Sequence, residues 1–113
     1  MAHDEGLAQI LRDALTGTPG VTEKRMFGGL CFLLNGNMLC GVHGEKAGPG
    51  AMFRVGKQNE AAALAIEGAG PMSFTGRKMG GMVDVTAEAL ADDASRAEWL
   101  RLALDFVGPM PSK

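Results

Sequence analysis

The stretch LCFLLNGNMLCGV, residues 30–42, predicts a β-hairpin around which the rest of the fold is organised. Its two apolar runs flank Asn35-Gly36, a dipeptide that favours a two-residue type I′ turn because both central positions of that turn need positive φ. Both faces of the hairpin are apolar, since non-polar residues occupy consecutive positions in each strand. One face can pack on helices. If the chain leaves the second face uncovered, that face predicts a partner protein or a homodimer.

Helical and strand-like patterns surround this hairpin. Residues 7–15 carry apolar side chains at helical spacing. Before the hairpin, Gly28-Gly29 interrupts an extended segment, which predicts one strand with a bend or bulge. Ser95 and Glu98 have the spacing of a capping box for the last helix. The expected elements are a helix at 7–15, strands at 21–34, 37–42 and 51–55, a helix at 59–67, strands at 72–75 and 82–86, and a last helix that ends at about 107.

These elements predict an α+β fold with the order α-β(3)-α-β(2)-α, in which an antiparallel sheet packs against helices. The 113 residues are 46% hydrophobic and 21% charged, which suits a chain that buries a core and excludes a disordered one. No internal repeat or domain linker is visible. We therefore expect a single domain over residues 1–113, with a core from about 5 to 108.

The hairpin register places the two cysteines opposite each other. In a two-residue hairpin around Asn35-Gly36, Cys31 faces Cys40 at a non-hydrogen-bonded pair, where Cα atoms are about 4.5 Å apart. That spacing permits a disulfide, so a thiol redox protein using Cys31 and Cys40 is one alternative. Two small buried apolar side chains are the favoured interpretation, because no CxxC motif and no neighbouring group that lowers a thiol pKa is present.

The residues that could support catalysis, a metal or a cofactor are few. Two cysteines and two histidines are the candidate metal ligands, and they lack the short pair spacings of a zinc site. His43 is interpreted as a surface residue, and no Ser, Cys or Lys has the context of a nucleophile. The glycine-rich segments 44–50 and 76–81 do not match phosphate-binding loops. We therefore expect no enzyme activity, no catalytic or metal-binding residues and no cofactor.

Two basic segments with similar sequences are the candidates for a partner-binding site. Each segment has two basic residues and then a methionine, and a pair of glycines follows, directly after Met79 and one residue after Met26. If the two segments lie near each other, they form a positive, methionine-bearing patch suited to a protein partner, or weakly to phosphate. The candidate partner-binding residues are Lys24, Arg25, Met26, Phe27, Arg77, Lys78 and Met79.

Weak nucleic-acid binding through the Lys24-Arg25 and Arg77-Lys78 turns is the first alternative. The net charge of −2 and the lack of aromatic residues suited to stacking on bases argue against direct binding. The N-terminus lacks the basic and apolar regions of a signal peptide, and no apolar stretch is long enough to span a membrane. Free cysteines in a chain without an export signal predict a reducing compartment, the cytoplasm.

The sequence resembles the N-terminal domain of the TfoX/Sxy family from about residue 7 to 107. The segments that carry the resemblance are RMFGGL (25–30), FLLNGNM (32–38), RVG (54–56), PMSFTGRKM (71–79) and LADD (90–93) followed by Trp99. The resemblance implies the same α-β(3)-α-β(2)-α fold and a role in regulating competence genes, with family members acting as coactivators of the cyclic-AMP receptor protein. It brings no catalytic residues. Because the sequence ends at Lys113, we expect a stand-alone copy without the family's C-terminal domain.

The residues and the resemblance together predict a non-catalytic protein-interaction module of the cytoplasm. The resemblance implies that it is a transcriptional accessory factor related to competence regulators. The expected partner is a protein, and the resemblance alone suggests a component of the transcription machinery. A homodimer is the further alternative that the apolar hairpin raises.

Overall fold

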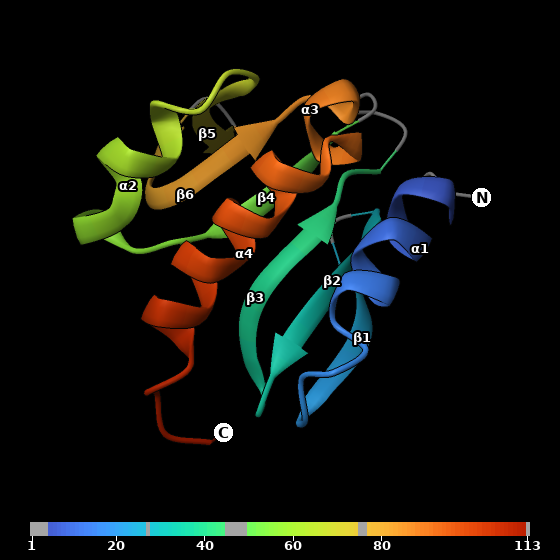
Figure 1. Cartoon of the computed structure of the whole chain (residues 1–113). Coiled ribbons are helices and arrows are strands. Elements are labelled where there is room, and N and C mark those ends of the chain that lie inside the picture. Colours follow the sequence, from blue (N-terminus) through green and yellow to red (C-terminus); the bar gives the residue numbers. More distant parts are fainter. Residues whose placement is uncertain (1–4, 27, 45–49, 75–76, 113) are drawn as a thin grey trace.

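The computed structural model describes residues 5–26, 28–44, 50–74 and 77–112, and the side chains of residues 72–79 are left aside. These parts of the chain form four helices and six strands (Figure 1). In chain order the elements are α1 (Glu5–Ala14), β1 (Val21–Met26), β2 (Gly29–Leu34), β3 (Asn37–Val42), β4 (Ala51–Arg54), α2 (Lys57–Leu64), β5 (Ala69–Phe74), β6 (Arg77–Val85), α3 (Ala87–Ala91) and α4 (Asp93–Val107).

All six strands belong to one antiparallel sheet with the order β1-β2-β3-β4-β6-β5. The helices lie on one face of this sheet, with α1 over the β1–β3 side and α4 across its middle (Figure 1). One continuous core joins that face to residues from every helix, including Leu7, Ala63, Leu90 and Trp99. The α+β class and the antiparallel sheet packed against helices are therefore confirmed.

The expected count of three strands before α2 is wrong, because residues 21–34 form two strands. β1 and β2 pair with each other along their whole length, from Val21 with Leu34 to Met26 with Gly29. Gly28 has a φ of +78°, a backbone conformation that glycine adopts without a steric penalty. The glycines thus mark a reversal of the chain between two strands and not a bend within one strand.

The turn of the central hairpin is as predicted, but the register changes two residues beyond it. Asn35 and Gly36 have positive φ values of 52° and 87°, as a type I′ turn requires. Leu33 pairs with Met38, and Phe32 then pairs with Cys40, so Leu39 is an extra residue in β3. Such a bulge moves every later side chain of the bulged strand by one position relative to its partner strand.

The C-terminal part contains two helices, and the predicted capping box at Ser95 and Glu98 is wrong. α3 and α4 are separated by Asp92, whose extended backbone makes it the N-cap of α4. The Asp92 carboxylate accepts a hydrogen bond from Ser95 N at 2.9 Å. Glu98 instead accepts from Arg101 Nε at 3.0 Å on the helix surface. Asp92 takes the capping role because its carboxylate accepts from the backbone N–H group of Ser95, which lies three residues further on in the first turn and has no partner within the helix.

Trp99 joins α4 to both the sheet and α2. Its side chain is fully buried, and its ring stacks on Phe53 of β4 with ring centroids 5.7 Å apart. The indole Nε1 donates to Ala63 O at 3.1 Å, so the one polar atom of the side chain has a partner in the interior. This contact satisfies a buried donor that would otherwise carry a desolvation cost.

We expect Trp99→Ala to lower the free energy of unfolding by about 3–5 kcal/mol, because it leaves a large cavity between α4 and the sheet. Trp99→Phe keeps a ring against Phe53 but removes the indole donor, so its loss should be smaller. Urea unfolding followed by circular dichroism measures both values. An equal loss for the two variants would contradict a stabilising role for the ring that packs against Phe53.

The Asp92 cap should make α4 sensitive to acid. The hydrogen bonds from Ser95 lower the pKa of Asp92 below its ordinary value of 3.8. A lowered folded-state pKa means that the stabilisation is complete above the ordinary pKa and is lost as the pH falls through the folded-state value. We expect Asp92→Ala to lower the Tm at pH 7 more than Asp92→Asn, which keeps an acceptor. The Tm difference between the wild type and Asp92→Ala should shrink as the pH falls below 3.8, the ordinary pKa of this carboxyl group.

Candidate functional site

The sheet face opposite the helices carries a cluster of sulfur-containing and aliphatic side chains. Its buried members come from β2, β4 and β6, and partly buried residues from β1, β2 and β3 pack around them. We call this set the methionine face: Met26, Cys31, Leu33, Met38, Met52 and Met82. None of these residues comes from a described helix. The apolar second face predicted for the hairpin therefore exists and extends over five strands.

Cys31 and Cys40 lie on opposite faces of the sheet, so the prediction that they face each other is wrong. Because of the bulge at Leu39, Cys31 pairs with Gly41, and Cys40 pairs with Phe32. Cys31 belongs to the methionine face, whereas Cys40 packs in the helix-covered core. Both thiols are free and buried, and burial raises the pKa of each. Side chains that leave the sheet in opposite directions cannot form a disulfide without backbone movement.

The two basic segments do not come together in the fold. Lys24 and Arg25 are exposed on β1 at one edge of the sheet, whereas Arg77, Lys78 and Met79 lie on β6. Three strands separate β1 from β6, and neighbouring strands are about 4.8 Å apart. Met26 is half-buried on the methionine face, Phe27 lies outside the described residues, and so do the side chains of residues 77–79. The sheet order therefore does not support a single positive patch.

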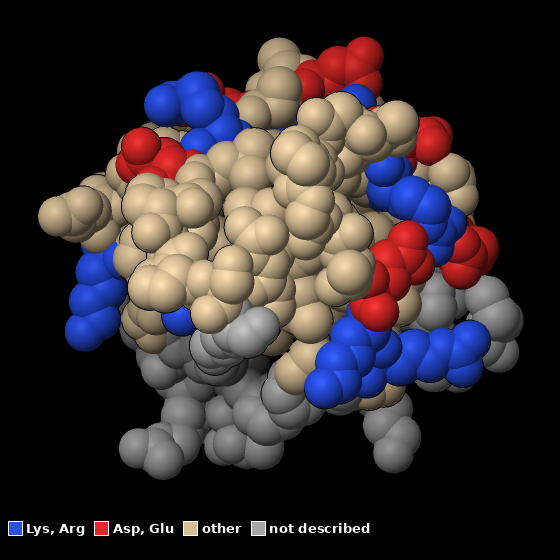
Figure 2. All heavy atoms as spheres, turned by 90° about the horizontal axis from the view of Figure 1, so that it is seen from below, with Lys and Arg blue, Asp and Glu red and all other residues tan. Residues whose placement is uncertain are grey.

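The end of the molecule that lies lowest in Figure 1 is largely uncharged. Three segments form it: residues 17–20, the hairpin turn at 35–36 and the C-terminal residues 108–112. Asn35 N donates to Gly20 O at 2.9 Å, and Asn37 Nδ2 donates to Pro111 O at 3.0 Å, which ties the three segments together. Figure 2 views this end and shows Lys and Arg at separate places around an uncharged area. Lys and Arg lie at the rim of this uncharged area, with Asp and Glu among them (Figure 2).

His43 is not the isolated surface residue that was expected. Its side chain is 12% exposed, and its Nε2 lies 2.5 Å from Asp84 Oδ1. His43 follows β3 and Asp84 lies on β6, 41 positions further along the chain. Sequence reasoning missed the pair because only the sheet brings these two residues together.

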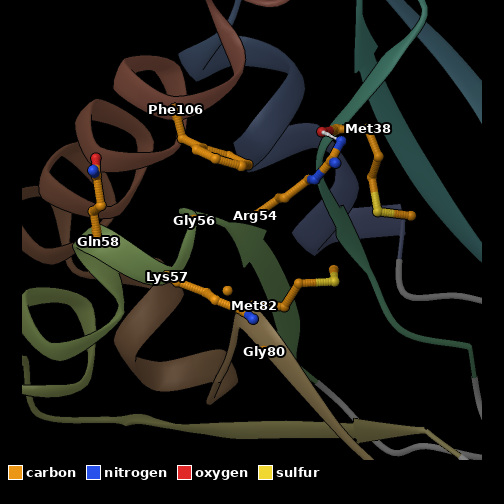
Figure 3. A pocket seen from close by; sticks show the side chains of 9 residues that line it. Met38, Arg54, Gly56, Lys57, Gln58, Gly80, Met82 and Phe106 are labelled. Atoms are coloured by element: carbon orange, nitrogen blue, oxygen red, sulfur yellow. Dashed lines mark hydrogen bonds between the residues drawn. The ribbon is translucent and has the colours of Figure 1, made fainter.

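A pocket of about 740 Å³ opens where the edge of the methionine face meets α2 and α4. Figure 3 shows Arg54, Lys57, Met82 and Phe106 around the same space. The described lining residues are Met38, Arg54, Gly56, Lys57, Gln58, Gly80, Gly81, Met82 and Phe106. The pocket therefore combines two cationic side chains with two thioethers and an aromatic ring.

Gly56 makes room for the aromatic wall of this pocket. It has a φ of +83°, and a Cβ atom at this position would lie 2.3 Å from Cδ1 of Phe106. The guanidinium carbon of Arg54 lies 5.5 Å from the centroid of the same ring, which is within cation–π range. Only glycine lets Phe106 approach the start of α2 this closely, and the ring in turn supports Arg54.

Sequence reasoning missed the pocket residues, although one signal for them was present. The tripeptide RVG at 54–56 is one of the segments that carry the family resemblance, and it contains both the arginine and the glycine. Lys57 and Phe106 have no comparable local signal. They join the pocket because α2 and α4 pack in contact with each other.

The part of the chain that the structure describes contains no group of three or more His, Cys, Asp or Glu residues arranged to hold a metal ion. Over the same residues, no helix combines the length and the apolar character that a membrane crossing needs.

The fold and the pocket define an α+β domain with one helix-covered sheet face, one methionine-rich face and a cationic pocket beside it. The family profile of the TfoX N-terminal domain matches residues 13–107, which is most of the chain. The chain therefore belongs to the TfoX N-terminal domain family, as the resemblance predicted. No curated protein and no solved structure matches it.

Both thiols should react slowly in the native protein. Their raised pKa values keep the thiolate fraction low at neutral pH, and burial blocks the reagent. We expect labelling by a disulfide reagent to be much slower in buffer than in guanidinium chloride, where both cysteines should titrate at once. Mass spectrometry after mild oxidation checks the pairing. An intramolecular disulfide formed without unfolding would contradict the placement of Cys31 and Cys40 on opposite faces.

Proposed function

We propose that this chain is a non-catalytic protein-interaction module of the cytoplasm that acts as a transcriptional accessory factor. Membership of the TfoX N-terminal domain family supports a regulatory role related to that of competence regulators. The expected partner is a component of the transcription machinery. The methionine face is the surface that we propose for contact with it.

The observation that carries this proposal is the composition of the methionine face. Three of its residues, Met26, Leu33 and Met38, are only partly buried and so keep surface that a partner can cover. Methionine is unbranched and polarisable, which lets one surface adapt to a partner of irregular shape. Lys24 is exposed on the neighbouring strand and pairs in register with Cys31, which adds a polar rim to the apolar surface.

The two alternative functions lose their main support in the fold. Direct nucleic-acid binding depended on the basic turns at 24–25 and 77–78 acting together, and three strands lie between β1 and β6. A redox function depended on Cys31 facing Cys40, and the register places them on opposite faces. Neither alternative gains a new observation in its favour.

The test is affinity capture from a native lysate with the full chain as bait. We expect Leu33→Asp to reduce recovery of the specific partners about tenfold or more, because it places a charge within the apolar contact surface. Met26→Glu tests the same surface from another strand in case Leu33→Asp does not fold. Ala61→Asp, an exposed change on α2, is the matched control and should leave recovery unchanged.

Sedimentation of the same variants separates a foreign partner from a second copy of the chain. A wild-type dimer that Leu33→Asp dissociates would place the homodimer contact on the methionine face. Equal recovery of all proteins by the wild type, Leu33→Asp and Met26→Glu would overturn this surface. A monomer that captures no transcription component would overturn the proposed role.

A further inference from the structure

The geometry points to a second function for the pocket between β4, β6, α2 and α4. We infer that it binds a small organic oxyanion, that is, a carboxylate or a phosphate attached to an apolar body. Such a ligand would be additional to the protein partner proposed above, and the two can be tested separately.

The size and the walls of the pocket suit a small molecule. Its volume of about 740 Å³ falls in the range of about 300–1,000 Å³ typical of ligand sites. The apolar walls are Met38, Met82 and Phe106, which come from two strands and a helix that only the tertiary fold brings together. Thioethers and an aromatic ring offer favourable contacts to an aromatic or aliphatic ligand body.

The charged groups that line the pocket have one sign. Arg54 and Lys57 are both cationic, and none of the described lining residues is acidic. Within the described residues neither of the two forms an ion pair with a carboxylate. Two cations beside an apolar surface attract an anion, because among the described residues neither is neutralised by an ion pair.

Arg54 rests against the ring of Phe106, and among the described residues its guanidinium makes one hydrogen-bond contact. Its Nη1 lies 3.5 Å from Met38 O, which is long for a hydrogen bond. The ring of Phe106 supports the guanidinium at 5.5 Å. A guanidinium has five N–H donors in a fork that matches the oxygens of a carboxylate or phosphate. A guanidinium that the ring supports, and that has no carboxylate partner among the described residues, is partly ordered to receive an oxyanion.

The backbone beneath these side chains is closely tied. Val55 N and Gly56 N both donate to Gly81 O at 2.9 Å, which fixes the start of α2 against β6. Gly81 N in turn donates to Glu60 Oε1 at 2.9 Å, so a backbone group engages that carboxylate oxygen. Lys57 extends over Gly80, where a Cβ atom would lie 3.3 Å from Lys57 Cε. These contacts therefore hold the backbone around the pocket in position without a ligand.

The test uses 1-anilinonaphthalene-8-sulfonate, an aromatic anion whose fluorescence rises in an apolar site, with the full chain in its native state. We expect saturable, salt-sensitive binding that benzoate or phenyl phosphate displaces. Inorganic phosphate should displace the probe more weakly, because it has no apolar body. Benzyl alcohol, which has the body without the charge, should also compete more weakly than benzoate. If benzoate displaces the probe at the lower concentration, the pocket prefers a carboxylate. If phenyl phosphate does so, the pocket prefers a phosphate.

Single charge removals locate the binding site. Arg54→Gln should weaken probe binding about tenfold or more, as expected for the loss of a hydrogen-bonded charged group. Lys57→Gln should weaken it several-fold, and it leaves the contact between Arg54 and Phe106 intact in case Arg54→Gln does not fold. Arg25→Gln removes the same charge from the exposed edge strand and is the matched control. Circular dichroism and thermal unfolding establish that each variant is folded.

Absence of saturable binding to the native protein would overturn the inference. Equal affinity in the wild type and Lys57→Gln, or equal displacement by benzoate and benzyl alcohol, would do so too, since the site would then not select for charge. Affinity capture with Lys57→Gln keeps the two functions distinct. Loss of probe binding with unchanged partner recovery assigns the pocket to a small molecule.

Discussion

The extra residue in β3 is the constraint on which the two faces of the sheet depend. Because Leu39 has no partner in β2, the pairing changes from Leu33 with Met38 to Phe32 with Cys40. Leu39 and Cys40 both reach the helix-covered core, whereas Met38 remains on the other face. A regular hairpin would have put one of these two core residues on the wrong face. The bulge thus gives the helices a continuous apolar floor and leaves the methionines together on the opposite side.

The two faces have different physical tasks. The helix-covered face holds the large fully buried side chains, with Trp99 and Phe53 stacked at its centre. The methionine face is smaller and keeps three residues only partly buried. The pocket lies where this second face meets α2 and α4, and it depends on the close approach of Gly56 to Phe106. The helix-covered face therefore carries most of the stability, whereas the proposed binding surfaces lie on the methionine face and at its border with α2 and α4.

Local patterns were sufficient for much of the fold and for little of the candidate site. Helical spacing located α1, and the Asn35-Gly36 turn was correct because its backbone requirement is local. The break at Gly28 was misread, since a glycine pair permits a bend and a reversal equally and only strand pairing decides between them. The capping box at Ser95 and Glu98 is wrong because α4 begins earlier, where the Asp92 side chain accepts from Ser95 N.

The sequence by itself determined the α+β class, the central turn, the apolar second face of the hairpin and the family to which the chain belongs. Only the tertiary structure decided which residues share a face or a pocket. Cys31 and Cys40 were separated by a one-residue shift in pairing, which no local pattern reveals. Arg54 and Phe106 meet across 52 positions of chain because α4 packs against β4. Side-chain contacts at such a distance are set by the packing of whole elements, and that packing is not written in any single stretch of the sequence.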